Sequence, residues 1–168
     1  MYITRVGIGY DVHRLIKISA DGFMPICGIK LPCNYIVDAH SDGDVGLHAL
    51  TEAILGAIAN GNIGSHFPAT DEKWRNKESK FFVQYANDLI KEIGGQIINI
   101  DITIICEHPK VMPRSLGMRQ FIADILSINL DQVSVKAATT EKMGFLGRQE
   151  GIAAQAICGI LMQNKFLK

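Results

Sequence analysis

The sequence has no excess of charge of either sign, because 17 lysines and arginines balance 17 aspartates and glutamates among 168 residues. A protein that binds nucleic acid or an anionic membrane through its overall field needs a basic excess, so the balance speaks against both partners. No apolar run approaches the ~20 residues of a membrane-spanning helix. We therefore expect any anionic ligand to be held by local groups: a metal, a few cations or backbone N–H groups.

The sequence also lacks closely spaced pairs of cysteines. The four cysteines, at positions 27, 33, 106 and 158, include no C-x-x-C pair. Two of them lie in apolar runs, where a thiol usually packs as a small hydrophobic group. The first residues, MYITRVGIGYDVHR, contain no apolar stretch of signal-peptide length and no amphipathic leader rich in Arg and Ser. These features predict a cytoplasmic protein with reduced thiols.

The chain also lacks repeats of fixed period, low-complexity tracts and linkers rich in Pro, Gly or Ser. Its length suits one globular domain with a sizeable core, so residues 1–168 are predicted to form a single domain. Such a core is stable without a structural metal. A metal bound here would therefore need a functional explanation.

Hydrophobic periodicity predicts the order of the elements. Alternating or β-branched segments predict strands at residues 3–13, 97–106 and 133–138. Apolar residues at helical spacing predict helices at residues 44–60, 78–93, 113–127 and 149–163. Between them, a loop or hairpin is predicted at 22–41, with a short edge pair near 25–31, and a surface loop at 61–77. This order predicts an α+β fold, a two-layer sandwich with helices on one face of a small sheet.

The first predicted strand carries two kinds of signal. Gly7 and Gly9 indicate that another part of the chain approaches its backbone closely. Asp11 and His13 lie at i and i+2, and on a strand such residues project from the same face. A carboxylate and an imidazole can chelate a metal, but catalytic zinc usually takes three protein ligands. His48, in the first turns of the helix predicted at 44–60, is the natural third.

A structural alternative exists for each of these residues. Asp11 can make turn hydrogen bonds, His13 can be a surface histidine, and His48 can be a core histidine with a partner. Around His48, the segment AHSDGDVGLH at 39–48 contains two histidines, two aspartates and a serine. Ser41 followed by Asp44 resembles a capping box, which places the helix start near residue 42. Capping explains neither His40 nor His48.

A third cluster, KAATTEKMGFLGRQEG at 136–151, follows a strand. Its hydroxyls, carboxylate, glycines and arginine can cradle a phosphate and a hard cation, because Mg²⁺ commonly binds through one or two carboxylates plus substrate phosphates. The structural alternative is a glycine-rich connection in which Thr and Glu cap the next helix.

Five motifs follow one another along the chain: VGIGYDVHR (6–14), AHSDGDVGLHAL (39–50), GNIGSHFPATD (61–71), HPKVMP (108–113) and TTEKMGFLGRQEGIA (139–153). In this order they resemble one family, the 2-C-methyl-D-erythritol 2,4-cyclodiphosphate synthases of the non-mevalonate isoprenoid pathway. The resemblance spans nearly the whole chain. It implies a homotrimer with active sites between adjacent subunits, each subunit built on a four-stranded sheet with helices.

The resemblance also implies the metals and the reaction. Asp11, His13 and His48 match the residues that bind one Zn²⁺ per subunit, and Glu141 matches the contact to a Mg²⁺ or Mn²⁺ that bridges the α- and β-phosphates. The implied substrate is 4-diphosphocytidyl-2-C-methyl-D-erythritol 2-phosphate. Its 2-phosphate attacks the β-phosphorus, closes a cyclic diphosphate and expels CMP, with no covalent enzyme intermediate. Positioning and charge neutralisation by metals suit this kind of transfer.

The resemblance implies further roles around the substrate. His40 and Thr139 match groups that stabilise the transition state, and residues 106–112 match a turn that receives cytidine largely through backbone groups. The implied substrate-binding residues are Ser41, Asn62, Ile63, Gly64, Phe67, Asp71, Cys106, Pro109, Lys110, Met112, Thr140, Phe145 and Arg148.

The sequence departs from the family pattern near the sugar. Asn62 and Ala69 stand where the family commonly has acidic residues, Glu52 replaces a shorter Asp, and Ala138 replaces a Thr. Asn62 can still accept a hydrogen bond, whereas Ala69 offers no side-chain partner.

Several alternatives stay open. In the family, a hydrophobic channel on the trimer axis can accept an isoprenoid diphosphate near an arginine, which Arg148 matches; alternatively, Arg148 pairs with Glu150 across subunits. A zinc hydrolase that uses metal-bound water needs the same three ligands. A non-catalytic trimeric binder of isoprenoid diphosphates is the third hypothesis.

Overall fold

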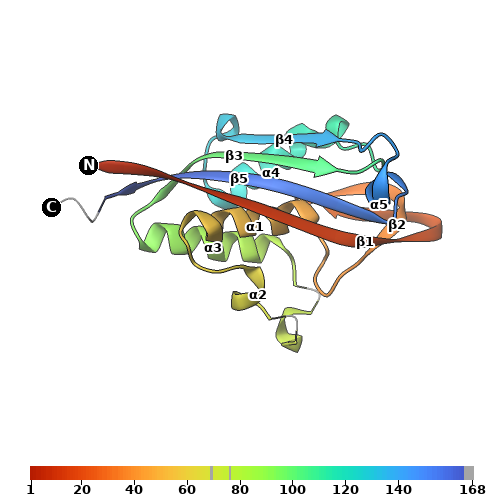
Figure 1. Cartoon of the computed structure of the whole chain (residues 1–168), viewed down its shortest axis with the longest axis horizontal. Coiled ribbons are helices and arrows are strands. Elements are labelled where there is room, and N and C mark those ends of the chain that lie inside the picture. Colours follow the sequence, from red (N-terminus) through yellow and green to blue (C-terminus); the bar gives the residue numbers. More distant parts are fainter. Residues whose placement is uncertain (69, 76, 165–168) are drawn as a thin grey trace.

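The computed structural model describes residues 1–68, 70–75 and 77–164, which form a sheet and a layer of helices (Figure 1). The strands are β1 (Tyr2–Ile26), β2 (Ile29–Asp38), β3 (Gln96–Ile105), β4 (Val133–Ala138) and β5 (Gly151–Gln163). The helices are α1 (Val45–Ala57), α2 (Ile63–His66), α3 (Lys80–Glu92), α4 (Ser115–Leu126) and α5 (Gly144–Gly147). Single turns of 3-10 helix lie at Glu72–Trp74, Met112–Arg114 and Leu130–Gln132.

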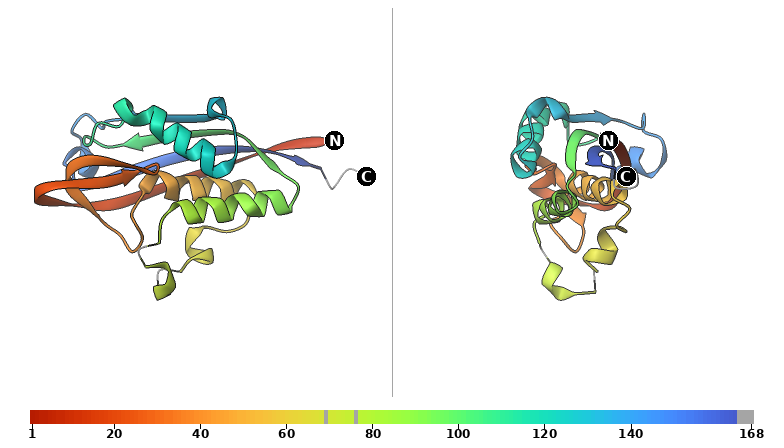
Figure 2. Two further views of the ribbon diagram at one scale, coloured as in Figure 1. Left: turned by 180° about the vertical axis from the view of Figure 1, so that it is seen from behind. Right: turned by 90° about the vertical axis from the view of Figure 1, so that its left-hand side faces the viewer.

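The strands form one sheet in the order β2-β1-β5-β3-β4. Neighbouring strands are antiparallel except β3 and β4, which are parallel and are joined through α4. Seen from behind, α1, α3 and α4 lie in front of the sheet (Figure 2). The predicted α+β class is confirmed. The expected number of four strands is wrong, because the described residues form five.

The first strand is much longer than predicted. β1 runs through 25 residues and pairs with β5 over its first half and with β2 over its second half. Cys27 and Gly28 form the two-residue turn into β2, at φ values of 49° and 80°. Positive φ at both central residues is typical of the tight turn that matches the twist of a hairpin. The hairpin predicted within 22–41 is confirmed, and it is longer than the short pair expected near 25–31.

The helix predicted at 149–163 is wrong, because this segment forms β5, the central strand of the sheet. The run GIAAQAICGILMQ is almost entirely apolar. A strand covered on both sides shows the same continuous apolar pattern as a buried helix. The distant pairing partners β1 and β3, rather than local periodicity, decide its conformation.

The other predicted helices and strands are confirmed within a few residues, as α1, α3, α4, β3 and β4. α1 begins at Val45 rather than near residue 42, because the Asp44 carboxylate accepts the backbone N–H of Leu47 at 3.0 Å and caps the helix. Ser41 is therefore not part of a capping box, and that prediction is wrong. Among the described helices, none combines the length and apolar character needed to cross a membrane.

α1 lies directly on the backbone of β1. A Cβ at Gly7 would come within 2.0 Å of the Ala53 carbonyl oxygen, and a Cβ at Gly9 within 1.9 Å of the Ala49 carbonyl oxygen. The close approach predicted from these glycines is confirmed, and α1 is the element that makes it. This contact brings the first turns of α1 beside the middle of β1.

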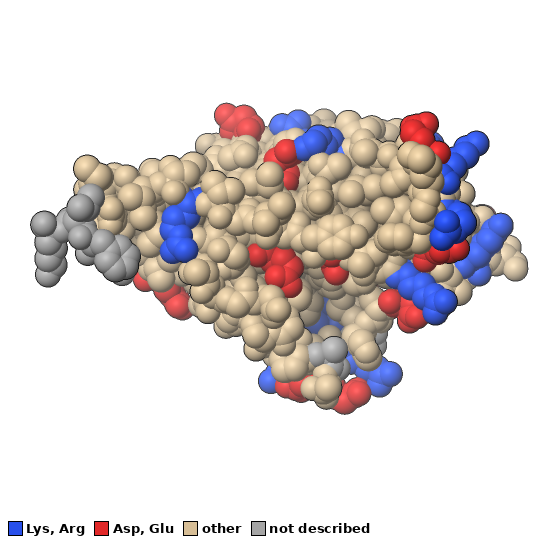
Figure 3. All heavy atoms as spheres, in the orientation of Figure 1, with Lys and Arg blue, Asp and Glu red and all other residues tan. Residues whose placement is uncertain are grey.

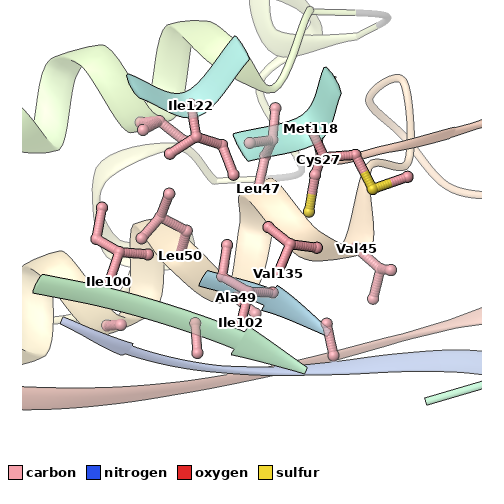
Figure 4. Packing of buried hydrophobic residues seen from close by; sticks show 14 of the residues in the cluster. Cys27, Val45, Leu47, Ala49, Leu50, Ile100, Ile102, Met118, Ile122 and Val135 are labelled. Atoms are coloured by element: carbon pink, nitrogen blue, oxygen red, sulfur yellow. The ribbon is translucent and has the colours of Figure 1, made fainter. Parts of the chain in front are cut away.

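The core fills the space between the sheet and the longer helices. In Figure 4, side chains of α1, β3 and α4 point toward one another, among them Leu47, Leu50, Ile100, Ile102, Met118 and Ile122. All six are at most 1% exposed. α1 is thus packed against the sheet, with α3 beside it in the helical layer (Figure 2).

Candidate functional site

Three side chains from β1 and α1 converge on one point, and we call Asp11, His13 and His48 the metal triad. Asp11 Oδ2 lies 3.0 Å from both His13 Nε2 and His48 Nδ1, and the two nitrogens are 3.1 Å apart. In the part of the chain that the structure describes, these are the residues whose ligand atoms gather closely enough to hold a metal ion. The i, i+2 spacing on β1 and the close seat of α1 produce this convergence.

The donor set of the triad fits a divalent metal. Tetrahedral zinc with bonds of ~2.0–2.1 Å keeps its ligand atoms about 3.3 Å apart, and the three distances here are 3.0, 3.0 and 3.1 Å. Hydrogen bonds alone do not account for the triangle, because a carboxylate and two imidazoles have protons for at most two of its three edges. Two nitrogens and one oxygen are also a ligand set that catalytic zinc uses.

Ser41 orients the ring of His48. The Ser41 hydroxyl oxygen lies 3.0 Å from His48 Nε2 and accepts the backbone N–H of Gly43 at 3.2 Å. When His48 Nε2–H donates to this oxygen, the lone pair of Nδ1 faces Asp11 and His13, as a metal ligand requires. Sequence reasoning missed this contact. A serine seven residues before a histidine has no fixed direction until the loop between them is folded.

The carboxylate of the triad is ionised at neutral pH. Burial raises the pKa of Asp11, but hydrogen bonds and charge interactions with His13 and His48 lower it more, so the pKa lies well below its ordinary range. His48 is 8% exposed, and its ring centroid is 5.9 Å from that of Phe82. The carboxylate is therefore ionised and held in place, ready for a cation.

A cavity of about 340 Å³ opens over the metal triad, and we call it the triad cavity. Further predicted residues that line it are His40, Ser41, Ile63, Gly64 and Phe67. Trp74 and Phe82 also line it, and sequence reasoning did not identify them because an aromatic cluster forms only when the 61–77 loop folds onto α3. In Figure 3, the surface is hollowed between the sheet and the lobe that carries α2.

Asn62 has a structural task next to this cavity. It is the N-cap of α2, where its Oδ1 accepts the backbone N–H of Ser65 at 2.8 Å. Glu52 anchors the same turn to α1, because its Oε1 accepts the backbone N–H of Ile63 at 3.0 Å. The residues that depart from the family pattern here therefore hold Ile63 and Gly64 against the cavity, while Asn62 itself does not line it.

Asp71 is also engaged locally. Its carboxylate caps the 3-10 turn that follows and pairs with Lys73 Nζ at 2.7 Å. Asp71 does not line the triad cavity. Ala69, the other departure from the family pattern, lies outside the described residues.

A second group of predicted residues lies at the carboxyl ends of β3 and β4, around a cavity of about 310 Å³ that we call the turn cavity. The predicted residues that line it are Cys106, Pro109, Lys110, Met112 and Thr139. Burial raises the pKa of the Cys106 thiol to about 11, so the thiol stays neutral. The Thr139 hydroxyl donates to Glu141 at 2.8 Å, and that of Thr140 donates to the Met143 carbonyl at 2.8 Å.

The triad cavity and the turn cavity share no lining residue. Within one chain, His40 is therefore grouped with the metal triad, while Thr139 belongs to a separate place. Glu141 is exposed. A single carboxylate is an incomplete magnesium site, and phosphate oxygens of a ligand would have to complete it.

A third cavity, of about 630 Å³, is lined by Phe145 and Arg148 together with the cations Arg14 and Lys17. Arg148 pairs with Glu150 of the same chain, through contacts of 2.9 and 3.2 Å. Arg148 thus has a pairing partner inside its own chain, and pairing with Glu150 across subunits stays a prediction. Binding of an isoprenoid diphosphate near Arg148 stays a prediction.

Several known proteins are similar to this chain. The YgbB family matches residues 4–161. A protein of Ehrlichia canis named 2-C-methyl-D-erythritol 2,4-cyclodiphosphate synthase is 54% identical over 163 residues, covering 95% of this chain and 94% of that protein. The bifunctional IspDF from Campylobacter jejuni has a TM-score of 0.91 at 36% identity, covering 98% of this chain and 44% of that one. The Plasmodium falciparum IspF–CDP complex has a TM-score of 0.83 at 32% identity, covering 96% and 97%.

Proposed function

This chain belongs to the YgbB family, and on that premise we propose that it converts 4-diphosphocytidyl-2-C-methyl-D-erythritol 2-phosphate to 2-C-methyl-D-erythritol 2,4-cyclodiphosphate and CMP. The observation that carries the proposal is the metal triad beside a cavity that His40 also lines. The names of the curated relatives and the CDP complex of a similar structure support the same activity.

The proposed reaction is an intramolecular phosphoryl transfer. An oxygen of the 2-phosphate attacks the β-phosphorus and closes the ring. The bond from the β-phosphorus to the bridging oxygen breaks, and CMP leaves with that oxygen. Bound Zn²⁺ and Mg²⁺ or Mn²⁺ supply neutralisation of charge on the phosphate oxygens.

The residues of this chain hold and orient the reacting groups in the proposal. The metal triad binds zinc, and Glu141 binds the second ion together with substrate phosphates. His40 and Thr139 donate hydrogen bonds to phosphoryl oxygens where negative charge develops. Residues 106–112 receive the cytosine and ribose, and Ile63 and Gly64 bound the sugar. The alignment of attacking oxygen, phosphorus and leaving group then supplies much of the rate.

We propose that the protein acts as a homotrimer in which each active site uses two adjacent chains. The separation of the triad cavity from the turn cavity supports this, because both groups of residues must meet one diphosphate. The side of the sheet opposite α1, α3 and α4 (Figure 2), which we call the outer face, supports it too. Val6, Ile8, Tyr10 and Ile157 on this face are 44–69% exposed. Such a contiguous apolar surface is typical of an interface between proteins.

Incubation of the purified protein with the diphosphocytidyl substrate and Mg²⁺ tests the activity. We expect CMP and the cyclic diphosphate in equal amounts, measured by phosphorus NMR. CMP with the open-chain 2,4-bisphosphate, formed by attack of water on the β-phosphorus, would instead support a zinc hydrolase. Tight binding of an isoprenoid diphosphate without turnover would support the non-catalytic binder.

The variant His48→Ala tests the metal triad. We expect elemental analysis to find about one zinc per chain in the wild type and none in the variant, because two ligands do not hold catalytic zinc. CMP release should fall below detection. As a control, His66→Ala should keep its zinc, because His66 contacts Tyr85 and the Asn60 carbonyl outside the triad. Unchanged CMP release by His48→Ala would contradict the proposed function.

A further inference from the structure

The Glu107 carboxylate joins the two segments that follow β3 and β4. Because these strands are parallel neighbours, their carboxyl ends meet at one edge, where the Cys106 N–H donates to the Ala138 carbonyl at 3.1 Å. One residue further, Glu107 Oε1 accepts the backbone N–H groups of Thr140 and Lys142, each at 3.2 Å. One oxygen thus holds two donors from the neighbouring segment, and we call this contact the Glu107 clamp.

The loop held by the clamp has an unfavourable backbone conformation. Glu141 and Lys142 have φ values of 52° and 63°, in the left-handed region that costs free energy for any residue with a Cβ. The Glu107 oxygen offsets this cost, because it accepts two backbone N–H groups of the loop in this conformation, those of Thr140 and Lys142. Without the acceptor, we expect the loop to leave this conformation.

The clamp determines the direction of two side chains with predicted roles. Glu141 lies between Thr140 and Lys142, the residues whose N–H groups are held. Its carboxylate accepts the Thr139 hydroxyl at 2.8 Å. On the other side, a Cβ at Gly147 would come within 2.1 Å of the Lys142 carbonyl carbon, so the loop is packed from both directions.

We propose that Glu107 is a positioning residue, which acts by presenting Glu141 to the second divalent cation and Thr139 to the diphosphate. It also ties this loop to the predicted cytidine turn, so the nucleotide end and the metal-bound end of a ligand are held at one spacing. The identity of the ligand rests on the proposed function, whereas the clamp does not.

Amide hydrogen exchange tests the clamp in the ligand-free protein. Glu107→Ala removes the acceptor, while Glu107→Gln keeps an oxygen that can accept both N–H groups. We expect exchange of residues 139–143 to be faster by at least about tenfold in the alanine variant, because two hydrogen bonds that hold the loop are lost. Exchange in the glutamine variant should stay within about threefold of the wild type.

Binding of Mn²⁺ in the presence of CDP, followed by electron paramagnetic resonance, tests the positioning role without any turnover. We expect Glu107→Ala to weaken Mn²⁺ binding by about tenfold or more and Glu107→Gln by no more than about threefold. Glu141→Ala is the reference variant, because it shows how far Mn²⁺ affinity falls when the Glu141 carboxylate is absent. Zinc content should be unchanged in all three variants, because the triad cavity contains neither residue.

The outcomes separate the two proposals. Unchanged exchange in Glu107→Ala, or faster exchange with unchanged Mn²⁺ affinity, would overturn the positioning role. Equal weakening of Mn²⁺ binding in Glu107→Ala and Glu107→Gln would overturn it as well, because the charge of Glu107 rather than its acceptance of hydrogen bonds would then matter. Absence of Mn²⁺ binding by the wild type would also overturn it. If the alanine variant does not fold, Glu107→Ser carries the same comparison. If wild-type protein binds Mn²⁺ but forms no cyclic product, the proposed function fails while the positioning role stands.

Discussion

His48 can serve as a metal ligand only if its Nδ1 carries a lone pair, and the Ser41 hydroxyl is placed to favour that tautomer. When His48 Nε2–H donates to Ser41 Oγ across the contact of 3.0 Å, the proton is held on the far side of the ring. Asp44 caps α1, so the Ser41 hydroxyl is not needed as the cap and can contact His48. At the scale of single residues, the metal triad therefore depends on a fourth side chain.

The variant Ser41→Ala tests this dependence. We expect zinc affinity, measured by competition with a chelator, to fall by about 10–100-fold, the usual effect of losing a partner behind a metal ligand. Ser65→Ala is the matched control, because Ser65 contacts only Asn62 at the start of α2 among its described hydrogen bonds. A zinc affinity of Ser41→Ala equal to that of the control would contradict the role of the hydroxyl.

At the scale of elements, the pair β1 and α1 builds the triad, because β1 supplies two ligands and α1 the third. The missing side chains at Gly7 and Gly9 allow the helix to lie on the strand backbone. Asp44 adds a second connection, since its carboxylate accepts the backbone N–H groups of Cys27 and Gly28 in the hairpin turn at 2.8 and 2.6 Å. The distance between the ligands is set by this packing.

Two glycine substitutions compare a close contact with an open one. Gly9→Ala should lower the free energy of unfolding by about 3 kcal/mol or more, because its Cβ would overlap the α1 backbone. Gly56→Ala, exposed on α1 with 3.6 Å to the Ile8 carbonyl oxygen, should raise it by about 0.5–1 kcal/mol. Urea unfolding measures both, and equal effects would show that the helix does not depend on the glycine at position 9.

At the scale of the whole molecule, one chain places the predicted site residues around two separate cavities, and the proposed function requires both groups at one substrate. The triad cavity lies between the sheet and the α2 lobe, and the turn cavity lies beyond the ends of β3 and β4. The outer face lies toward the viewer in Figure 3, where much of the surface over β1 and β5 is uncharged. Assembly through this face would bring residues of different chains together.

The variant Ile8→Lys tests the assembly. Ile8 is 69% exposed on the outer face, and burying a lysine charge in an interface is unfavourable. We expect light scattering to show a smaller species and CMP release to be lost, while about one zinc per chain is retained because the metal triad lies within one chain. Leu116→Lys, at 62% exposure on α4, is the control and should keep its assembly. A monomeric Ile8→Lys protein with full activity would contradict the shared active site.

The sequence by itself determined the parts of this protein that depend on local spacing. Asp11 and His13 share a face of β1 because residues two apart on a strand always do, and α1, α3 and α4 follow from apolar residues at helical spacing. The family resemblance added the expected roles of these residues, and the match of the YgbB family confirmed the family.

Only the tertiary structure decided the features that join distant segments. β5 is a strand because β1 and β3 pair with it, and its apolar run alone fits a buried helix equally well. Glu107 holds the N–H group of Thr140, 33 residues away, and the two cavities separate along the same chain. The physical reason is that strand pairing and side-chain hydrogen bonds between distant segments form only when the whole chain packs. A local sequence pattern therefore does not show which of these contacts will form.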